Sequence, residues 1–204
     1  MSNHQATEQM LGYLYQIRYA LALLLKNDNP DYQISIEKFD DVAFDKDGQP
    51  VQLIQLKHHI KQKGNLTDSS ADLWRTLKVW IDSLAQKPEL LDSTEFLIIT
   101  TAIAPENSAA GYLKQNDRDP NTAYTKLKDV CKQSKNAAQK KYYDAFLSAD
   151  QLTVKKLFEH IYIRIRPKCE EAFVMRGSYH MLANKLKVGW HVDFFERLKG
   201  LLYT

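Results

Sequence analysis

The chain has 204 residues, of which 44% are hydrophobic and 26% charged, and its formal net charge is +3. These values are ordinary for a folded protein with a sizeable core, and they argue against intrinsic disorder. A weakly basic balance is compatible with a polyanionic partner but does not require one.

The first half of the chain predicts the element order α-β-β-α-β. Apolar side chains at three- and four-residue spacing indicate helices, and strict alternation indicates strands. The two predicted strands form a β-hairpin around Asp45-Lys46-Asp47-Gly48, with a loop of about five or six residues. Trp74 and Trp80 are predicted core residues. The five elements are a helix over 5–26, strands over 32–44 and 51–58, a helix from about 67–69 to 86, and a buried strand over 96–101.

The second half is predicted to be mostly helical, with one further strand. Its aromatic residues near 142–146 are expected to lie in the core. We therefore expect an α/β fold with a restriction-endonuclease-like core, in which a mixed β-sheet is flanked by helices. The predicted elements are a loop or short helical excursion over 105–121, helices over 122–133, 136–147 and 152–160, a strand with a charged outer face over 161–166, and a helical remainder over 169–202.

Cysteine usage and targeting signals favour a cytoplasmic protein. The two cysteines, Cys131 and Cys169, lie far apart, and no Cys/His spacing typical of a zinc site occurs. The N-terminus lacks a secretory-signal pattern, and the apolar stretch over 19–25 is far shorter than the roughly 20 residues of a membrane helix. We expect a cytoplasmic location and no membrane partner.

The predicted hairpin gathers residues suited to phosphodiester hydrolysis. Gln55 and Lys57 share one face of their strand, and a cluster of acids, Glu37, Asp40 and Asp41, lies one strand away. Such hydrolysis needs a hard cation, oxygen ligands that hold it, and a positive group near the phosphate. Acid, amide and amine side chains on one hairpin supply these three functions.

Which aspartate faces Gln55 depends on the register of the hairpin. If Asp45 pairs with Val51, Asp41 lies opposite Gln55, whereas a slip of one residue puts Asp40 there. We favour the first alternative, because the aspartate then shares a face with the glutamate of the acidic cluster.

These residues resemble a known active site. The run Glu37-Lys-Phe-Asp-Asp41-Val42, followed by a turn and by Gln55-Leu-Lys57-His58, resembles the hairpin of PD-(D/E)XK nucleases, closest to the Mrr-like variants with Gln in place of the acid. The flanking Leu66-Thr67-Asp68, residues 73–80 and residues 12–16 resemble more narrowly the Cap4-like nuclease domains at the N-terminus of bacterial antiphage effectors. The resemblance covers about residues 8–101.

The resemblance implies a Mg²⁺-dependent endonuclease, with Mn²⁺ as a possible substitute, that cuts double-stranded DNA with little sequence preference. It implies that Asp41 and Gln55 bind the metal with help from Glu37, that Lys57 is the catalytic lysine, and that Gln16 approaches the site from the first helix. Because Gln55 is neutral, one charge is missing from the implied metal site.

Cationic residues outside the hairpin are candidate DNA contacts. His58, Lys61 and Lys63 follow the hairpin and are predicted to contact the DNA backbone, although they equally suit a strand end and a solvated loop. The Lys-rich stretch 126–141 and the group Arg164, Arg166 and Lys168 are candidate DNA surfaces or ordinary charged faces.

The resemblance also predicts the organisation of the protein. We expect one nuclease domain over 1–204, with a core of about 5–101 completed by 122–202, at the front of a larger protein with a sensor or oligomerisation domain. Cutting both strands normally needs two sites, so the active form is expected to be a homo-oligomer. Two alternatives are a catalytically inactive nuclease-fold module that binds nucleic acid or a partner, and a pure interaction domain of a multi-subunit assembly.

Overall fold

The structure is a computed structural model that describes residues 3–27, 29, 31–38, 40–57, 64–116 and 118–165. These residues fall into two compact units, one ending at residue 57 and one spanning 64–165. Each unit has its own helices, strands and buried apolar residues.

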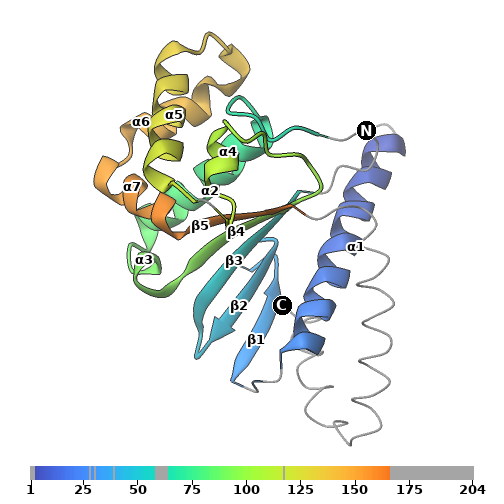
Figure 1. Cartoon of the computed structure of the whole chain (residues 1–204). Helices are drawn as coiled ribbons and strands as arrows, with labels where there is room; N and C mark the ends of the chain where they lie inside the picture. Colours follow the sequence, from blue (N-terminus) through green and yellow to red (C-terminus); the bar gives the residue numbers. More distant parts are fainter. Residues whose placement is uncertain are drawn as a thin grey trace, which may run out of the picture. The chain divides into compact units, whose positions relative to one another are not determined.

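The first unit is a long helix beside an antiparallel meander of three strands (Figure 1). The helix packs mainly against the first strand and buries Ala20, Leu24 and Leu25 in its C-terminal half, which confirms the predicted helix over 5–26. The elements are α1 (Asn3–Lys26), β1 (Tyr32–Ile36), β2 (Val42–Lys46) and β3 (Gln49–Lys57).

The predicted single strand over 32–44 was wrong, because a turn divides it into β1 and β2. Glu37 adopts the left-handed conformation with φ 59°, and its N–H donates to the carbonyl oxygen of Asp41 at 3.2 Å, which closes the turn. The alternation of apolar residues continues in phase from Ile36 to Val42 across this turn. Periodicity alone therefore could not reveal the break.

The turn between β2 and β3 is shorter than the five or six residues predicted. Asp47 and Gly48 both have positive φ, 53° and 78°, as a two-residue type I′ hairpin requires. The register also shifts between Phe44 and Asp45, so that Asp45 pairs with Pro50 and not with Val51. Because of this bulge, Phe44 pairs with Gln52, whereas without it the tight turn would pair Phe44 with Val51.

The second unit combines a parallel strand pair with helices. Strands β4 and β5 pair in parallel from Phe96↔Ile161 to Thr100↔Ile165. With the antiparallel meander of the first unit, this confirms an α/β fold that contains both kinds of strand pairing. The elements are α2 (Ala71–Gln86), α3 (Leu90–Ser93), β4 (Glu95–Thr100), α4 (Ala109–Tyr112), α5 (Pro120–Gln133), η1 (Ala137–Gln139), α6 (Lys140–Ser148), α7 (Gln151–His160) and β5 (Ile161–Ile165).

The predicted elements of the second unit are confirmed with small shifts of their ends. The helix predicted over 136–147 begins as the short 3₁₀-helix η1 and continues as α6, and the excursion predicted over 105–121 contains α4. The helical remainder predicted over 169–202 lies outside the described residues. Among the helices that the structure describes, none combines the length and apolarity of a membrane span.

The core of the second unit is built on aromatic rings. Trp74 and Trp80 are fully buried, as predicted. The ring of Trp74 meets Tyr143 edge-on, with centroids 4.7 Å apart, and meets Phe146 at 5.6 Å. These contacts pack α2 against α6.

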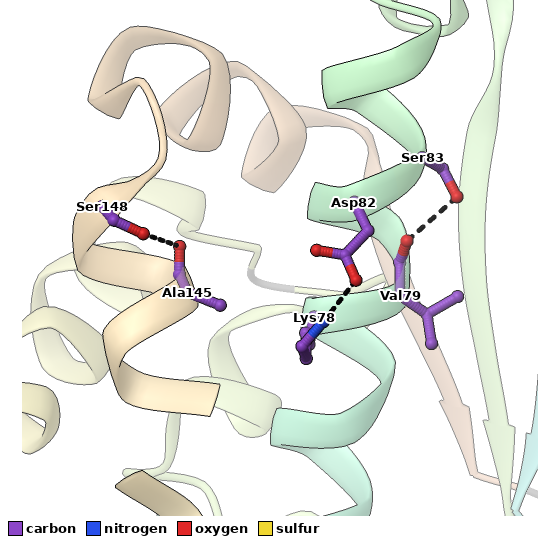
Figure 2. A network of polar contacts seen from close by, with 6 residues as sticks. All are labelled: Lys78, Val79, Asp82, Ser83, Ala145 and Ser148. Carbon is purple, nitrogen blue, oxygen red and sulfur yellow. Dashed lines mark hydrogen bonds and ion pairs between the residues drawn. The ribbon is translucent and has the colours of Figure 1, made fainter. Parts of the chain in front are cut away.

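The polar contacts drawn in Figure 2 each stay within a single helix, either α2 or α6. On α2, Lys78 pairs with Asp82, and the Ser83 hydroxyl donates to the carbonyl of Val79. On α6, the Ser148 hydroxyl donates to the carbonyl of Ala145 at 3.3 Å. The α2–α6 packing therefore depends on its aromatic contacts and not on these polar ones.

Candidate functional site

The structure places Asp41 against the strand that carries Gln55 and Lys57. The carboxylate oxygen Oδ2 of Asp41 accepts a hydrogen bond from the N–H of Leu56 at 2.8 Å. Val42, the first residue of β2, pairs with Ile54, and Asp41 directly precedes this pair. Gln55 and Lys57 alternate onto one face of β3, and the Asp41 carboxylate lies against the backbone of Leu56 between them.

The pairing from which the favoured alternative was derived is wrong. The pairing of Asp45 with Val51 does not occur, and the bulge after Phe44 compensates for it. The carboxylate of Asp40 accepts a hydrogen bond from the N–H of Asp41 at 3.0 Å. The two aspartates are therefore neighbours in one turn.

Glu37 reaches the site by a route that the sequence did not indicate. It was expected to share a strand face with Asp41, but the two residues stand at opposite ends of the β1–β2 turn and are joined by a backbone hydrogen bond. The side chain of Glu37 is exposed. Left-handed backbone costs about 1–2 kcal/mol for a residue other than glycine, and such strain is concentrated at functional sites.

Gln16 lies on α1, whose main packing partner is β1 and not the strand β3 that carries Gln55. Its amide oxygen is buried and has no hydrogen-bond partner among the described residues. A buried acceptor without a donor costs about 1–3 kcal/mol. The amide oxygen is therefore available to a cation or to a hydrogen-bond donor.

The face that carries Gln55 combines buried polar side chains with the apolar Ala43 and Leu53. Ser35 is opposite Ala43, which is opposite Leu53, so Ser35 shares this face with Gln55 two residues further along β3. Gln55 is 7% exposed and Asp45, on the same face of β2, is 3% exposed. Ser35 and Asp45 are therefore buried polar side chains on the same face as Gln55.

Sequence reasoning missed two members of this face. The hydroxyl oxygen of Ser35 and Oδ1 of Asp45 are buried without a hydrogen-bond partner within the part of the chain that the structure describes. The other oxygen of Asp45, Oδ2, lies 3.8 Å from Nζ of Lys38. The position of Ser35 between two isoleucines was a weak signal, and Asp45 gave none because it fell in the predicted turn.

The oxygen atoms at the hairpin suit a hard divalent cation held by few charges. Oδ2 of Asp41 is engaged by Leu56, and Oδ1 of Asp41 and the amide oxygen of Gln55 are suitable ligands. Among the described residues, no group of three or more His, Cys, Asp or Glu is arranged to hold a metal ion. Mg²⁺ takes one or two carboxylates and completes its shell with water and substrate phosphate, so these residues would hold a Mg²⁺ ion only with such additional ligands.

Most of the remaining residues predicted to contact DNA lie outside the described part of the chain. His58, Lys61 and Lys63 lie outside the described residues, as do Arg166 and Lys168. Arg164 is exposed on β5, in agreement with the predicted charged outer face of that strand.

Comparison with known proteins gives one match. Residues 116–198 match the family model of C-terminal domain 7 of the ABC-three component (ABC-3C) systems. No curated protein and no solved structure matches the chain. The match supports a domain of an antiphage defence system, and it begins after the region of the hairpin resemblance.

Proposed function

We propose that the chain is a Mg²⁺-dependent endonuclease component of an ABC-three component antiphage system, acting on double-stranded DNA with little sequence preference. The observation that carries the proposal is the hydrogen bond between Leu56 N–H and Asp41, which holds a carboxylate against the backbone of β3 between Gln55 and Lys57. The match over residues 116–198 supports the defence context.

Each residue of the hairpin has a distinct role in this proposal. Asp41, through Oδ1, and Gln55, through its amide oxygen, hold the metal, with the Glu37 carboxylate as a second acid. A bound Mg²⁺ supplies Lewis-acid polarisation of the phosphate and an activated water. Lys57 donates to the phosphate oxygen on which negative charge develops. The buried acceptors Ser35 and Asp45 make the same face attractive to cations.

Because Gln55 is neutral, the metal affinity of this site is proposed to depend on bound substrate. With one acid fewer, the residues attract a divalent cation weakly until DNA phosphate supplies the missing negative ligand. The matched family belongs to three-component systems, which suits a sensor on another component. Double-strand cutting then needs two copies of the site, and therefore an oligomer.

Plasmid cleavage with Mg²⁺ tests the proposal. The wild type, Lys57→Ala and a control, Lys46→Ala, are compared at equal and high protein concentration. Lys46 is an exposed lysine of β2, so its loss leaves the candidate site intact. We expect cleavage by the wild type and the control and none by Lys57→Ala. Equal cleavage by all three would refute the assignment to this hairpin.

A second candidate function is a metal-free nuclease fold that only binds a partner. The neutral Gln55, together with a family match that concerns multi-component systems, favours it. Calorimetric titration with Mn²⁺, in the presence of a non-cleavable DNA duplex, separates the two functions. Heat of binding that disappears in Asp41→Asn supports the nuclease, whereas no heat in either protein supports the binding module.

A further inference from the structure

A cationic corner lies between α5 and α6 of the second unit. Residues 126–141 contain six lysines and one aspartate. Four of these lysines already have partners: Lys126 lies over Tyr112, Lys128 over Tyr124 and Lys141 over Tyr142, and Lys140 pairs with Asp144. Lys132 and Lys135 are exposed and form no ion pair within the described part of the chain.

A hydrogen-bond network fixes the backbone that presents these lysines. The Tyr143 hydroxyl donates to Oε1 of the buried Gln139 at 2.7 Å, and Nε2 of Gln139 donates to the carbonyl of Ser69 at 2.9 Å. The hydroxyl of Ser134 lies 3.4 Å from that of Tyr143. The connection between α5 and α6 is therefore tied to the segment before α2, and its lysines project from a fixed frame.

Two more cations extend the corner. Nζ of Lys141 lies 5.0 Å from the ring centroid of Tyr142. A hydrogen bond from Arg75 of α2 lowers the pKa of Tyr142, and the charge of Lys141 acts in the same direction. The surface around the Tyr142 hydroxyl is thus positive, although Arg75 also lies 3.8 Å from Asp72.

We propose that this corner, defined as Arg75, Lys132, Lys135 and Lys141, binds the phosphate backbone of a nucleic acid. Lysines on a fixed frame make sequence-independent contacts with phosphate. Protein interfaces, by contrast, are depleted in lysine and enriched in aromatic and large apolar side chains, and residues 131–142 contain no exposed large hydrophobic residue. The surface is independent of the hairpin and does not require it to be catalytic.

The test is the binding of a fluorescently labelled DNA duplex of random sequence, measured by anisotropy over a series of salt concentrations in EDTA. The corner variant Lys132→Gln/Lys135→Gln is compared with Lys155→Gln/Lys156→Gln. The control removes the same charge from two exposed lysines of α7 in the same unit. Thermal melting confirms that both variants remain folded.

We expect the corner variant to bind more weakly, and the slope of log Kd against log salt to fall by about one for each phosphate that the protein no longer neutralises. The α7 control should match the wild type. Equal losses of affinity in both variants would show that only net charge matters and would overturn the proposal. The proposal would also be overturned if the wild type did not bind the duplex but bound polyglutamate through Lys132 and Lys135. That result would favour an acidic protein partner.

A third protein keeps this proposal separate from the nuclease proposal. Lys57→Ala removes at most one proposed phosphate contact and leaves the corner untouched, so its salt slope in EDTA should fall by no more than about one. Loss of binding in Lys57→Ala with full binding in the corner variant would place the nucleic-acid contacts on the hairpin alone and would overturn the corner.

Discussion

At the scale of single residues, Asp41 joins three strands. Its main-chain oxygen accepts from Glu37 at the end of β1, and its carboxylate accepts from Leu56 of β3. One residue is thus both a structural link and a candidate metal ligand. Substitutions that keep or remove its hydrogen-bond acceptor separate these two functions.

Asp41→Asn should remain folded and lose metal binding, because an amide oxygen still accepts from Leu56 but carries no charge. Asp41→Ala should lower the free energy of unfolding by about 1–3 kcal/mol, since the N–H of the buried Leu56 then has no partner. Urea denaturation and Mn²⁺ calorimetry measure both effects. An Asn variant as unstable as the Ala variant would contradict this division.

The strained backbone of Glu37 gives a second prediction at this scale. Glu37→Val should unfold about 1–2 kcal/mol more easily than Glu37→Gly, because a β-branched residue tolerates φ 59° poorly and glycine tolerates it well. Denaturation of the two variants measures the difference. If the carboxylate assists cleavage, both variants lose activity equally despite their different stabilities, and unequal activities would mean that stability controls the result.

At the scale of elements, the helix α7 begins at an exposed aspartate cap. Oδ2 of Asp150 accepts from the backbone N–H of Thr153 at 2.8 Å and from its hydroxyl at 2.7 Å. These hydrogen bonds, that from the hydroxyl first, lower the pKa of Asp150 below its ordinary 3.8. The stabilisation is complete above this ordinary value and is lost as the pH falls through the lower pKa of the folded protein.

Asp150→Asn should retain a hydrogen-bond acceptor at the cap. Because the amide does not titrate, the melting temperature of the variant should fall less than that of the wild type below about pH 4. Melting curves of the wild type and the variant between about pH 2 and 7 measure this effect. Asp92→Asn, at an exposed aspartate of α3, is the matched control. A variant whose curve runs parallel to the wild type would contradict the role of the carboxylate.

The elements differ in how far the sequence predicted them. Helices α2, α5 and α7 carry clear apolar stripes, and proline or a capping aspartate marks an end, so local signals determined them. The β1–β2 turn was missed because its polar residues continue the strand alternation. Asp41 was predicted opposite Gln55 through a pairing that does not occur; its contact with Leu56 and the bulge after Phe44 depend on tertiary pairing and leave no local signal.

At the scale of the whole molecule, the boundary of the family match is not a boundary of packing. The match begins at residue 116, yet α6 within it packs on Trp74 of α2 before it. Residues 64–115 and the described part of the matched segment belong to one compact unit. The matched domain is therefore expected to need α2 in order to fold.

Trp74→Ala should lower the free energy of unfolding by about 3–5 kcal/mol, because it leaves a cavity against Tyr143 and Phe146. Urea denaturation of the fragment 64–165, followed by its far-UV helical signal, measures the effect in the wild type and in the variant. The control Val79→Ala removes a partly exposed side chain of the same helix. A fragment 116–165 as stable as 64–165 would contradict the shared core.

The short connections of the meander have a consequence for the order of folding. β1, β2 and β3 are joined by turns over 37–41 and 47–48, whereas β4 and β5 are separated by residues 101–160. Local pairings close at a small entropic cost and form fast, and the parallel pair closes late. The candidate catalytic geometry is thus expected to mature before the segment that matches the three-component family. Under the proposed nuclease function, slow folding of the hairpin would therefore not delay cutting, and restraint would have to come from assembly with a partner.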